Sequence, residues 1–312
     1  MVNPDDMSLV DSVGKTAFVV NSWRATENAS EEPLFYDSFS GIFMNQFSTD
    51  SLLHFDQCLA GRAIKSFMGP RTLFIDEALR SEIASGVQQV VLLGSGLDCR
   101  ALRFFHPEVK FFEVDRQAVL EFKSSMLREK GFTHYPSKLI MGDYLEIDLI
   151  QSLLSAGVDP RKRILFIWEG NTFYLPTQRG KALLKRMLEA FPKARVVLDT
   201  MSLPLTSLNT GETKADSFIQ SMFDLVSHGK NLWLGPWSIA EYAEELGYRV
   251  IESVSMYDAI ERYRTTTAIQ NLYGSMDAWK TTFTFFKFYD LSILEADGKR
   301  GCFRCSKVQA CL

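Results

Sequence analysis

From residue 88 onward, short runs of apolar residues alternate with stretches whose apolar positions recur every three or four residues. The runs are typical of strands buried on both faces, and the stretches between them are typical of amphipathic helices. The expected strands are residues 90–93, 109–114, 139–141, 164–168 and 196–198. This alternation predicts an α/β fold with a doubly wound, mostly parallel sheet.

The chain on either side of this region has a different pattern. Residues 1–86 predict helices joined by loops, and residues 203–237 break the alternation, which indicates an insertion that lies over the strand ends as a lid. Two apolar runs, 250–256 and 281–288, predict a last pair of strands, the second of them central in the sheet. We therefore expect a single domain over residues 1–312. Its parts are an N-terminal helical segment (1–86), a central core (87–202), the lid (203–237), a C-terminal part of the core (238–290) and a tail (291–312).

Four successive expected strands end in an acidic residue. These residues are Asp115, Asp143, Glu169 and Asp199. Because ligands of open parallel sheets bind outside the carboxyl ends of the strands, we expect the chemistry of this protein at that edge.

A glycine turn, Gly94-Ser95-Gly96, follows the first strand, and Asp115 follows it at the end of the second strand. Glycines let the backbone approach a ligand closely, and an acid at this distance accepts hydrogen bonds from ribose hydroxyls. The pattern predicts a nucleotide-bearing cofactor, and its alternative is a plain turn between a strand and a helix.

The turn does not suit a dinucleotide. A dinucleotide fingerprint has a third glycine where this chain has Cys99, and Asp98 would repel a pyrophosphate. Asp98 suits a cationic ligand better. S-adenosylmethionine carries a ribose, a sulfonium and an ammonium but no phosphate, so the turn favours it over a nicotinamide cofactor.

Composition limits the other possibilities. The chain has 46% hydrophobic residues and a net charge of −4, which is typical of a globular protein and argues against a nucleic-acid partner. We see no signal peptide and no membrane-spanning run, and we expect a cytoplasmic protein with no membrane partner. Cys302 and Cys305 have no further pair or nearby histidine to complete a ligand set, so no metal site is expected, and the role of these residues and of Cys311 stays open.

Several segments resemble the leucine carboxyl methyltransferase family, which includes protein phosphatase methyltransferases and many bacterial methyltransferases. Residues 91–103, VLLGSGLDCRALR, resemble its cofactor loop, residues 112–115 its second motif and residues 164–170 the motif of its fourth strand. The segments around Arg24 and Arg71 resemble its N-terminal helices. The likeness runs in order over residues 16–290 and implies a Rossmann-like class I methyltransferase that uses S-adenosylmethionine.

The resemblance also implies roles for residues on the methionine side of the cofactor. Arg71 would pair with the cofactor carboxylate, and Gly94 and Gly96 would approach the methionine part. Arg24 falls where the family often has another basic contact. A fixed guanidinium suits this task because it binds a carboxylate through two hydrogen bonds.

The remaining implied contacts come from the next three strand ends. Asp115 would hold the ribose, and Asp143 and Tyr144 would flank the adenine. Glu169 would lie beneath the cofactor near the reacting centre. The chain departs from the family pattern at Cys99, and at Trp168 and Asn171 on either side of Glu169.

The reaction expected is an in-line methyl transfer to oxygen, with no catalytic residue assigned. A carboxylate acceptor needs no base, whereas a hydroxyl does, and among the four histidines only His228 is a plausible base. This favours a carboxylate on a small molecule or a protein. The alternatives are a nicotinamide-dependent oxidoreductase and a non-catalytic protein that binds the cofactor; the acceptor and the oligomeric state stay open.

Overall fold

A seven-stranded sheet forms the centre of the computed structural model, which describes residues 7–57, 59–202, 216–217, 219–220 and 239–297. The strand order is β3-β2-β1-β4-β5-β7-β6; β1 to β5 are parallel, and β7 runs antiparallel to both β5 and β6. This arrangement confirms the doubly wound, mostly parallel α/β fold. The strands are β1 (Gln89–Leu93), β2 (Lys110–Asp115), β3 (Ser137–Met141), β4 (Ile164–Trp168), β5 (Ala194–Met201), β6 (Tyr248–Ser255) and β7 (Tyr289–Ala296).

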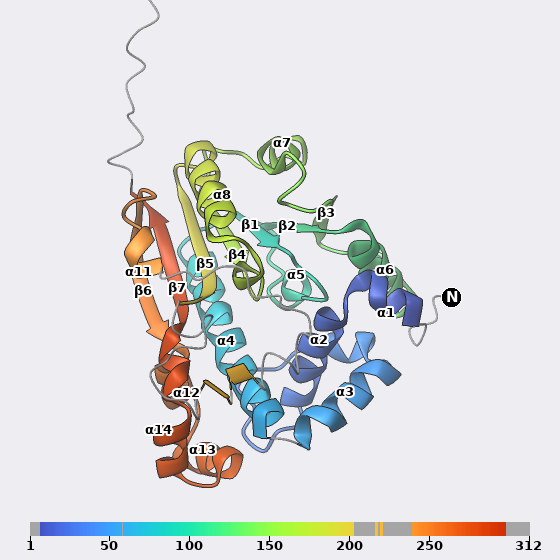
Figure 1. Ribbon diagram of the computed structural model, residues 1–312. Helices are drawn as coiled ribbons and strands as arrows, with labels where there is room; N and C mark the ends of the chain where they lie inside the picture. The colour runs from blue at the N-terminus through green and yellow to red at the C-terminus, as the bar shows by residue number, and fades with distance from the viewer. Residues whose placement is uncertain (1–6, 58, 203–215, 218, 221–238, 298–312) are drawn as a thin grey trace, which may run out of the picture.

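Helices cover both faces of the sheet (Figure 1). Helices α2, α3 and α4 contact one another, and α4 also packs against β4, β5 and β7. The α-helices are α1 (Met7–Val13), α2 (Lys15–Glu27), α3 (Gln46–Asp56), α4 (Leu59–Ala84), α5 (Arg100–Arg103), α6 (Gln117–Glu129), α7 (Leu149–Ser155), α8 (Thr177–Ala190), α11 (Ile239–Tyr242), α12 (Met256–Tyr263), α13 (Thr266–Tyr273) and α14 (Met276–Thr282). Three short 3-10 helices complete the set: η1 (Ser40–Phe43), η2 (Thr172–Tyr174) and η3 (Thr284–Phe288).

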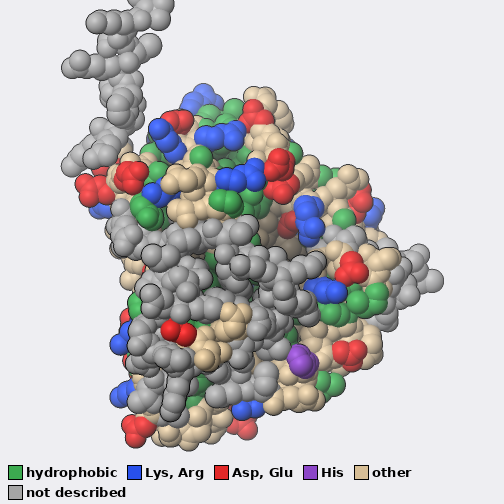
Figure 2. Space-filling model, viewed as in Figure 1, with side chains coloured by type: hydrophobic (Ala, Val, Ile, Leu, Met, Phe, Trp, Pro, Cys, Tyr) green, Lys and Arg blue, Asp and Glu red, His purple; other side chains and the backbone are tan. Residues whose placement is uncertain are grey.

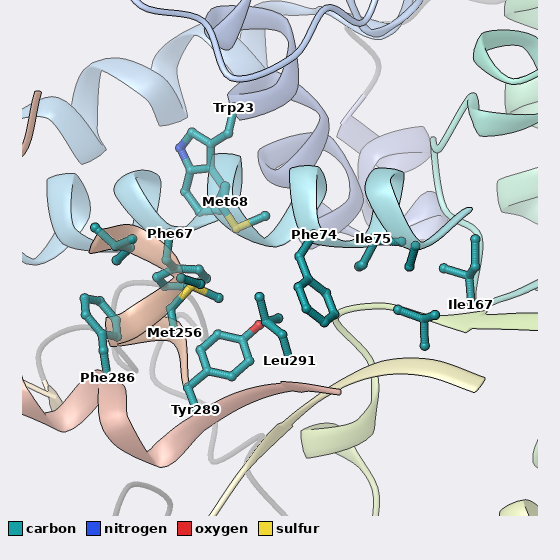
Figure 3. Packing of buried hydrophobic residues seen from close by; sticks show 14 of the residues in the cluster. Trp23, Phe67, Met68, Phe74, Ile75, Ile167, Met256, Phe286, Tyr289 and Leu291 are labelled. Atoms are coloured by element: carbon teal, nitrogen blue, oxygen red, sulfur yellow. The ribbon is translucent and has the colours of Figure 1, made fainter. Parts of the chain in front are cut away.

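Alternate residues of the central strands enter two separate cores, because successive side chains of a strand point to opposite faces. Val90 and Leu92 of β1 pack with α4, whereas Val91 and Leu93 pack with α8. Figure 3 shows the core on the α4 side, where side chains of α4 lie between Trp23 of α2 and the strands. Both faces of β1 are therefore buried, as its continuous apolar run predicts.

The prediction of a strand at residues 281–288 is wrong. Helix α14 ends at Thr282, η3 occupies Thr284–Phe288, and the strand β7 follows at Tyr289–Ala296. Phe283 and Phe286, three residues apart, are both buried, so the aromatic run turns as a helix rather than alternating as a strand. Residues 291–296, expected in the tail, thus lie in the sheet between β5 and β6.

Some expectations fall on residues outside the described part of the chain. The lid expected at 203–237 lies almost wholly there, and so do Cys58, Cys302, Cys305 and Cys311. Among the described residues, no helix is both long enough and apolar enough to cross a membrane.

Candidate functional site

A cavity of about 930 Å³ lies at the carboxyl ends of β1 to β4, the edge predicted to carry the chemistry. Its volume is near the upper end of the range of ligand pockets, roughly 300–1,000 Å³. The structure brings all the predicted site residues into the lining of this cavity: Arg24, Arg71, Gly94, Gly96, Asp115, Asp143, Tyr144 and Glu169.

The glycine turn after β1 has the conformation that requires glycine. Gly94 and Gly96 have φ angles of +62° and +53°, in the left-handed region that other residues avoid. A Cβ on Gly94 would lie 2.6 Å from Nδ2 of Asn171, so there is also no space for a side chain. The backbone of the turn is therefore exposed directly to the cavity.

Asp115 fastens the end of β2 to this turn. Its Oδ2 accepts a hydrogen bond from the Gly96 N–H at 2.7 Å, and its Oδ1 accepts one from the Arg116 N–H at 2.7 Å. Burial raises the pKa of Asp115 above its usual value, which these hydrogen bonds partly oppose. Each carboxylate oxygen has a second lone pair, so Asp115 can still accept hydrogen bonds from a ligand in the cavity.

The loop after β3 places Asp143 and Tyr144 beside the same cavity. The exposed Asp143 accepts a hydrogen bond from the Leu145 N–H at 2.9 Å. Tyr144 is buried, and its hydroxyl accepts a hydrogen bond from Nε1 of Trp168 at 3.2 Å, with the two rings edge to face. Trp168, one of the departures from the family pattern, thus fixes the orientation of the Tyr144 ring.

Glu169, at the end of β4, binds three arginines. Its Oε1 accepts hydrogen bonds from Nη2 of Arg24 at 2.8 Å and from Nε of Arg71 at 3.1 Å, and its Oε2 accepts one from Nη1 of Arg100 at 2.6 Å. Burial alone would raise the pKa of Glu169, but the three guanidinium groups hold it well below its usual range. Glu169 is therefore ionised, and it anchors the arginines rather than accepting a proton.

Arg71 also reaches two residues for which no role was predicted. Its Nη1 donates to Oδ2 of Asp199 at 3.3 Å and to the hydroxyl of Tyr289 at 3.1 Å. Asp199 in turn accepts a hydrogen bond from the Gly170 N–H at 2.7 Å, and burial raises its pKa. The sequence signal for Asp199 was its place after an apolar run; Tyr289 gave none, because its strand was expected elsewhere.

Arg100, the arginine that follows Cys99 in the segment after the glycine turn, is completely buried. Its Nε donates to Asp76 at 2.7 Å, and its Nη1 and its backbone N–H both donate to Asp98. Asp98 was expected to suit a cationic ligand, but its charge is already offset by Arg100. The buried cluster therefore matches four arginines with four carboxylates: Arg24, Arg71, Arg100 and Arg103 with Asp76, Asp98, Glu169 and Asp199.

Three donors in the lining suit an anionic or polar ligand group. Nε of Arg24 and Oγ of Ser95 are buried and have no hydrogen-bond partner among the described residues. Nη2 of Arg71 likewise donates to none of the residues that the structure describes. Since buried polar groups are rarely left unpaired, these donors indicate a ligand such as an amino-acid carboxylate.

The second half of the lining comes from α2, α3 and α4, and apart from Arg24 and Arg71 its residues were not predicted. Each helix presents residues three or four positions apart, and this spacing was present in the sequence. One of them is His54 of α3, which the sequence interpretation set aside as a base in favour of His228; His228 itself lies outside the described residues. Besides Arg24 and Arg71, the other members are Lys15, Thr16, Ala17, Val19, Val20 and Trp23 of α2, Phe47, Asp50, Ser51 and Phe55 of α3, and Ile64, Phe67 and Met68 of α4.

The chain matches a methyltransferase family and relatives that are named as methyltransferases. The family model described as "Leucine carboxyl methyltransferase" matches residues 17–188. A protein of Rhodococcus jostii named "Putative S-adenosyl-L-methionine-dependent methyltransferase" is 34% identical over 203 residues, which cover 64% of this chain and 69% of that one. A protein of Mycobacterium tuberculosis with the same description is 34% identical over 198 residues, covering 59% of this chain and 63% of the relative.

Solved structures share the fold. A structure from Thermobifida fusca, titled as a putative methyltransferase, matches with a TM-score of 0.55 and 13% identity, covering 90% of this chain and 94% of that one. A protein of the DUF574 family from Streptomyces avermitilis matches with a TM-score of 0.53 and 12% identity, over 89% and 96% of the two chains. At this identity the likeness concerns the fold alone.

Proposed function

Since the chain belongs to the leucine carboxyl methyltransferase family and is an S-adenosylmethionine-dependent methyltransferase, we propose that it methylates an oxygen of its acceptor, specifically a carboxylate. The family membership removes the support for a nicotinamide-dependent oxidoreductase. The observation that carries the choice of a carboxylate is that Glu169 is ionised and bound by three arginines.

The unpaired donors of the cavity fit the cofactor. In this proposal, Nη2 of Arg71, Nε of Arg24 and Oγ of Ser95 bind the amino-acid carboxylate of S-adenosylmethionine. Asp115 accepts hydrogen bonds from the ribose hydroxyls, and the adenine lies by Asp143 and Tyr144 in the loop after β3. The glycine turn gives these groups room, because Gly94 and Gly96 place no side chain in the cavity.

The acceptor must supply its own nucleophile if no base is available. Glu169 is the acid that the family resemblance places near the reacting centre, and its two oxygens are held by three guanidinium groups that lower its pKa. A carboxyl group in this state is a weak base at neutral pH. A carboxylate acceptor fits such a site, because its oxygen attacks without losing a proton.

When bound, S-adenosylmethionine supplies a methyl group on a positively charged sulfur, which becomes a neutral thioether as the acceptor oxygen bonds to the methyl carbon. The chain's contribution is to hold both reactants in line, which is worth on the order of 7–11 kcal/mol in favourable cases. The rigid cluster of Arg24, Arg71 and Glu169 serves this positioning, because it ties α2, α4 and β4 together at the cavity.

The product distinguishes the two acceptor classes. We suggest incubating the protein with S-adenosylmethionine labelled in the methyl group and with panels of carboxylic acids and phenols, then treating the products with alkali. Methyl esters release the label as methanol, and we expect this result. Label that survives alkali would indicate an ether and contradict a carboxylate acceptor.

A variant of His54 gives a second test. His54 is the histidine that lines the cavity among the described residues, and it is exposed. A carboxylate acceptor predicts that His54→Gln leaves the pH profile of kcat unchanged. Loss of an ionisation near neutral pH from that profile, together with a large fall in kcat, would show that His54 acts as a base toward a hydroxyl.

A further inference from the structure

The cavity has a second wall that the cofactor contacts proposed above do not use. The residues assigned to the cofactor follow β1 to β4 or belong to the arginine cluster, whereas α2, α3, α4 and η2 line the rest. A total volume of about 930 Å³ leaves room for a second small molecule beside the cofactor. The chemistry of this second wall therefore describes the acceptor.

The part of this wall formed by α4 and by the middle of α2 is apolar, whereas its polar residues are Lys15 and Thr16 at the start of α2 and Asp50, Ser51 and His54 of α3. On α2, Val19, Val20 and Trp23 line the cavity, and on α4, Phe67 and Met68 do so. In Figure 3 the Trp23 ring of α2 lies beside Met68 of α4, with Phe67 close by. Further apolar side chains of the lining belong to or pack against the same core cluster: Phe47, Phe55, Ile64, Ile167, Phe173, Tyr174 and Met201.

The apolar wall is continuous with the buried charges. Arg71 follows Phe67 and Met68 by one helical turn, about 5.4 Å along α4, and Arg24 directly follows Trp23 on α2. Both arginines bind Glu169 at the end of β4. A molecule that packs against Trp23 and Met68 therefore has one end next to the charged cluster and the rest in an apolar environment.

The charged cluster has no surplus positive charge for a second anionic group. Its four arginines face four carboxylates, and the amino-acid end of the cofactor brings a carboxylate and an ammonium, which balance each other. A ligand with a second carboxylate in the apolar wall would have to lose its hydration without gaining an ion pair there, which is costly. The acceptor is therefore expected to carry a single charge.

Trp23 offers one hydrogen bond within the apolar wall. The residue is 5% exposed, and its Nε1 has no hydrogen-bond partner among the described residues. An indole N–H can only donate, and a buried donor without a partner destabilises a protein. An oxygen of the acceptor would satisfy this group.

We propose that the methyl acceptor is a small, largely apolar monocarboxylic acid that packs between α2, α3, α4 and η2, and that the N–H of Trp23 donates a hydrogen bond to one of its oxygens. The identity of the acceptor as a methylated acid rests on the proposed function. The binding of an apolar acid in this pocket does not depend on the proposed function, so binding and methylation can be tested separately.

The binding test uses two acids of equal length, octanoate and octanedioate, which differ in the second carboxylate. Each is titrated by calorimetry into the full-length protein saturated with S-adenosylhomocysteine. We expect octanoate to bind at least tenfold more tightly than octanedioate. Equal affinities, tighter binding of octanedioate, or no binding of octanoate would overturn the apolar acceptor.

Substitutions of Trp23 and Met68 test whether these residues bind the acid. Trp23→Phe keeps the ring and removes the N–H, and we expect octanoate affinity to fall about three- to tenfold with S-adenosylhomocysteine affinity unchanged. Met68→Gln should weaken octanoate binding in the same way through the polarity of the wall. Leu53→Ala, an exposed residue of α3 that is not among those lining the cavity, is the control. An unchanged octanoate affinity in Trp23→Phe would overturn the hydrogen bond.

A turnover assay with the same acids separates the two proposals. If octanoate binds preferentially but no acid accepts a methyl group, the apolar pocket stands and the carboxylate methyltransferase does not. If polar diacids or a peptide carboxyl terminus are methylated to alkali-labile esters while octanoate is not bound, the proposed function stands and the apolar acceptor is wrong.

Discussion

Nη1 of Arg100 lies 2.6 Å from Oε2 of Glu169, and this contact joins the helix after the glycine turn to the end of β4. Arg100 also binds Asp76 of α4 and Asp98 of the turn, so one completely buried side chain connects three segments that line the cavity. On the face shown in Figure 2, by contrast, side chains of both signs are scattered among the described residues. The charges of this cluster are buried, and removing one partner of a buried ion pair has a large effect.

Glu169→Gln is expected to destabilise the fold strongly. The substitution keeps the shape of the side chain but leaves three buried guanidinium groups with one carboxylate fewer. Breaking a buried ion pair in this way costs about 3–5 kcal/mol, which urea denaturation would measure as a lower free energy of unfolding. Glu146→Gln removes an exposed pair with Arg179 and should cost less than about 1 kcal/mol. Equal effects of the two substitutions would show that the cluster does not stabilise the protein.

Asp115→Asn should weaken the binding of S-adenosylmethionine and S-adenosylhomocysteine alike, because both carry the ribose. Hydrogen bonds to a charged group contribute about 1.5–3 kcal/mol, so calorimetry should record a loss of roughly 10- to 100-fold in affinity. Because burial raises the pKa of Asp115, the wild-type affinity should also begin to fall at a higher pH on acidification than an exposed aspartate would allow. Wild-type affinity for both compounds in the variant would remove Asp115 from the ribose site.

Alanine at the two glycines of the turn should have unequal effects. Both positions have positive φ, which costs a side chain of L configuration about 1–2 kcal/mol. At Gly94 a Cβ would also collide with the Asn171 amide, whereas at Gly96 the nearest atom beyond the neighbouring residues of the chain is Cβ of Ala17 at an ordinary 3.9 Å. Gly94→Ala should therefore lower the melting temperature and cofactor affinity more than Gly96→Ala does.

The collision at Gly94 has its own control. Asn171→Ala removes the amide that a new Cβ would meet, so the double variant with Gly94→Ala should be less destabilised than the sum of the single changes. Asn171 also donates to the carbonyl groups of Gly94 and Glu169, so the single variant has a cost of its own. Simple additivity would mean that the turn shifts to accommodate the side chain, and the steric argument would fail.

The strands and the glycine turn could be predicted because their signals are local. A continuous apolar run followed by glycine or an acid defines where a buried strand ends, and the strand ends in turn place Gly94, Asp115, Asp143 and Glu169 at one edge of the sheet. The last strand could not be located in this way. Its residues follow an aromatic run in which apolar positions occur on every face, so neither a period of two nor one of three or four stands out.

The contacts within the site could not be predicted from local patterns. Arg24, Arg71 and Arg100 are separated from Glu169 by 145, 98 and 69 positions, and they meet because three helices and a strand converge. The spacing of the cavity-lining residues on α2 and α3 was visible, yet it marks an amphipathic helix without saying what its apolar face contacts. Only the packing shows that this face lines a cavity rather than a closed core.

Asp290 predicts a dependence of stability on pH. Burial, with a smaller contribution from the nearby Asp258, raises its pKa from 3.8 to about 6. The folded protein therefore binds a proton there more tightly than the unfolded chain does, and this stabilisation is lost as the pH rises through about 6. Asp290→Asn cannot ionise, so the variant should gain stability relative to the wild type as the pH rises: the difference in free energy of unfolding, variant minus wild type, should be about 1 kcal/mol larger at pH 8 than at pH 5. Urea denaturation at the two pH values measures this difference, and the same offset for Asp290→Asn at both pH values would mean that Asp290 titrates normally in the folded protein.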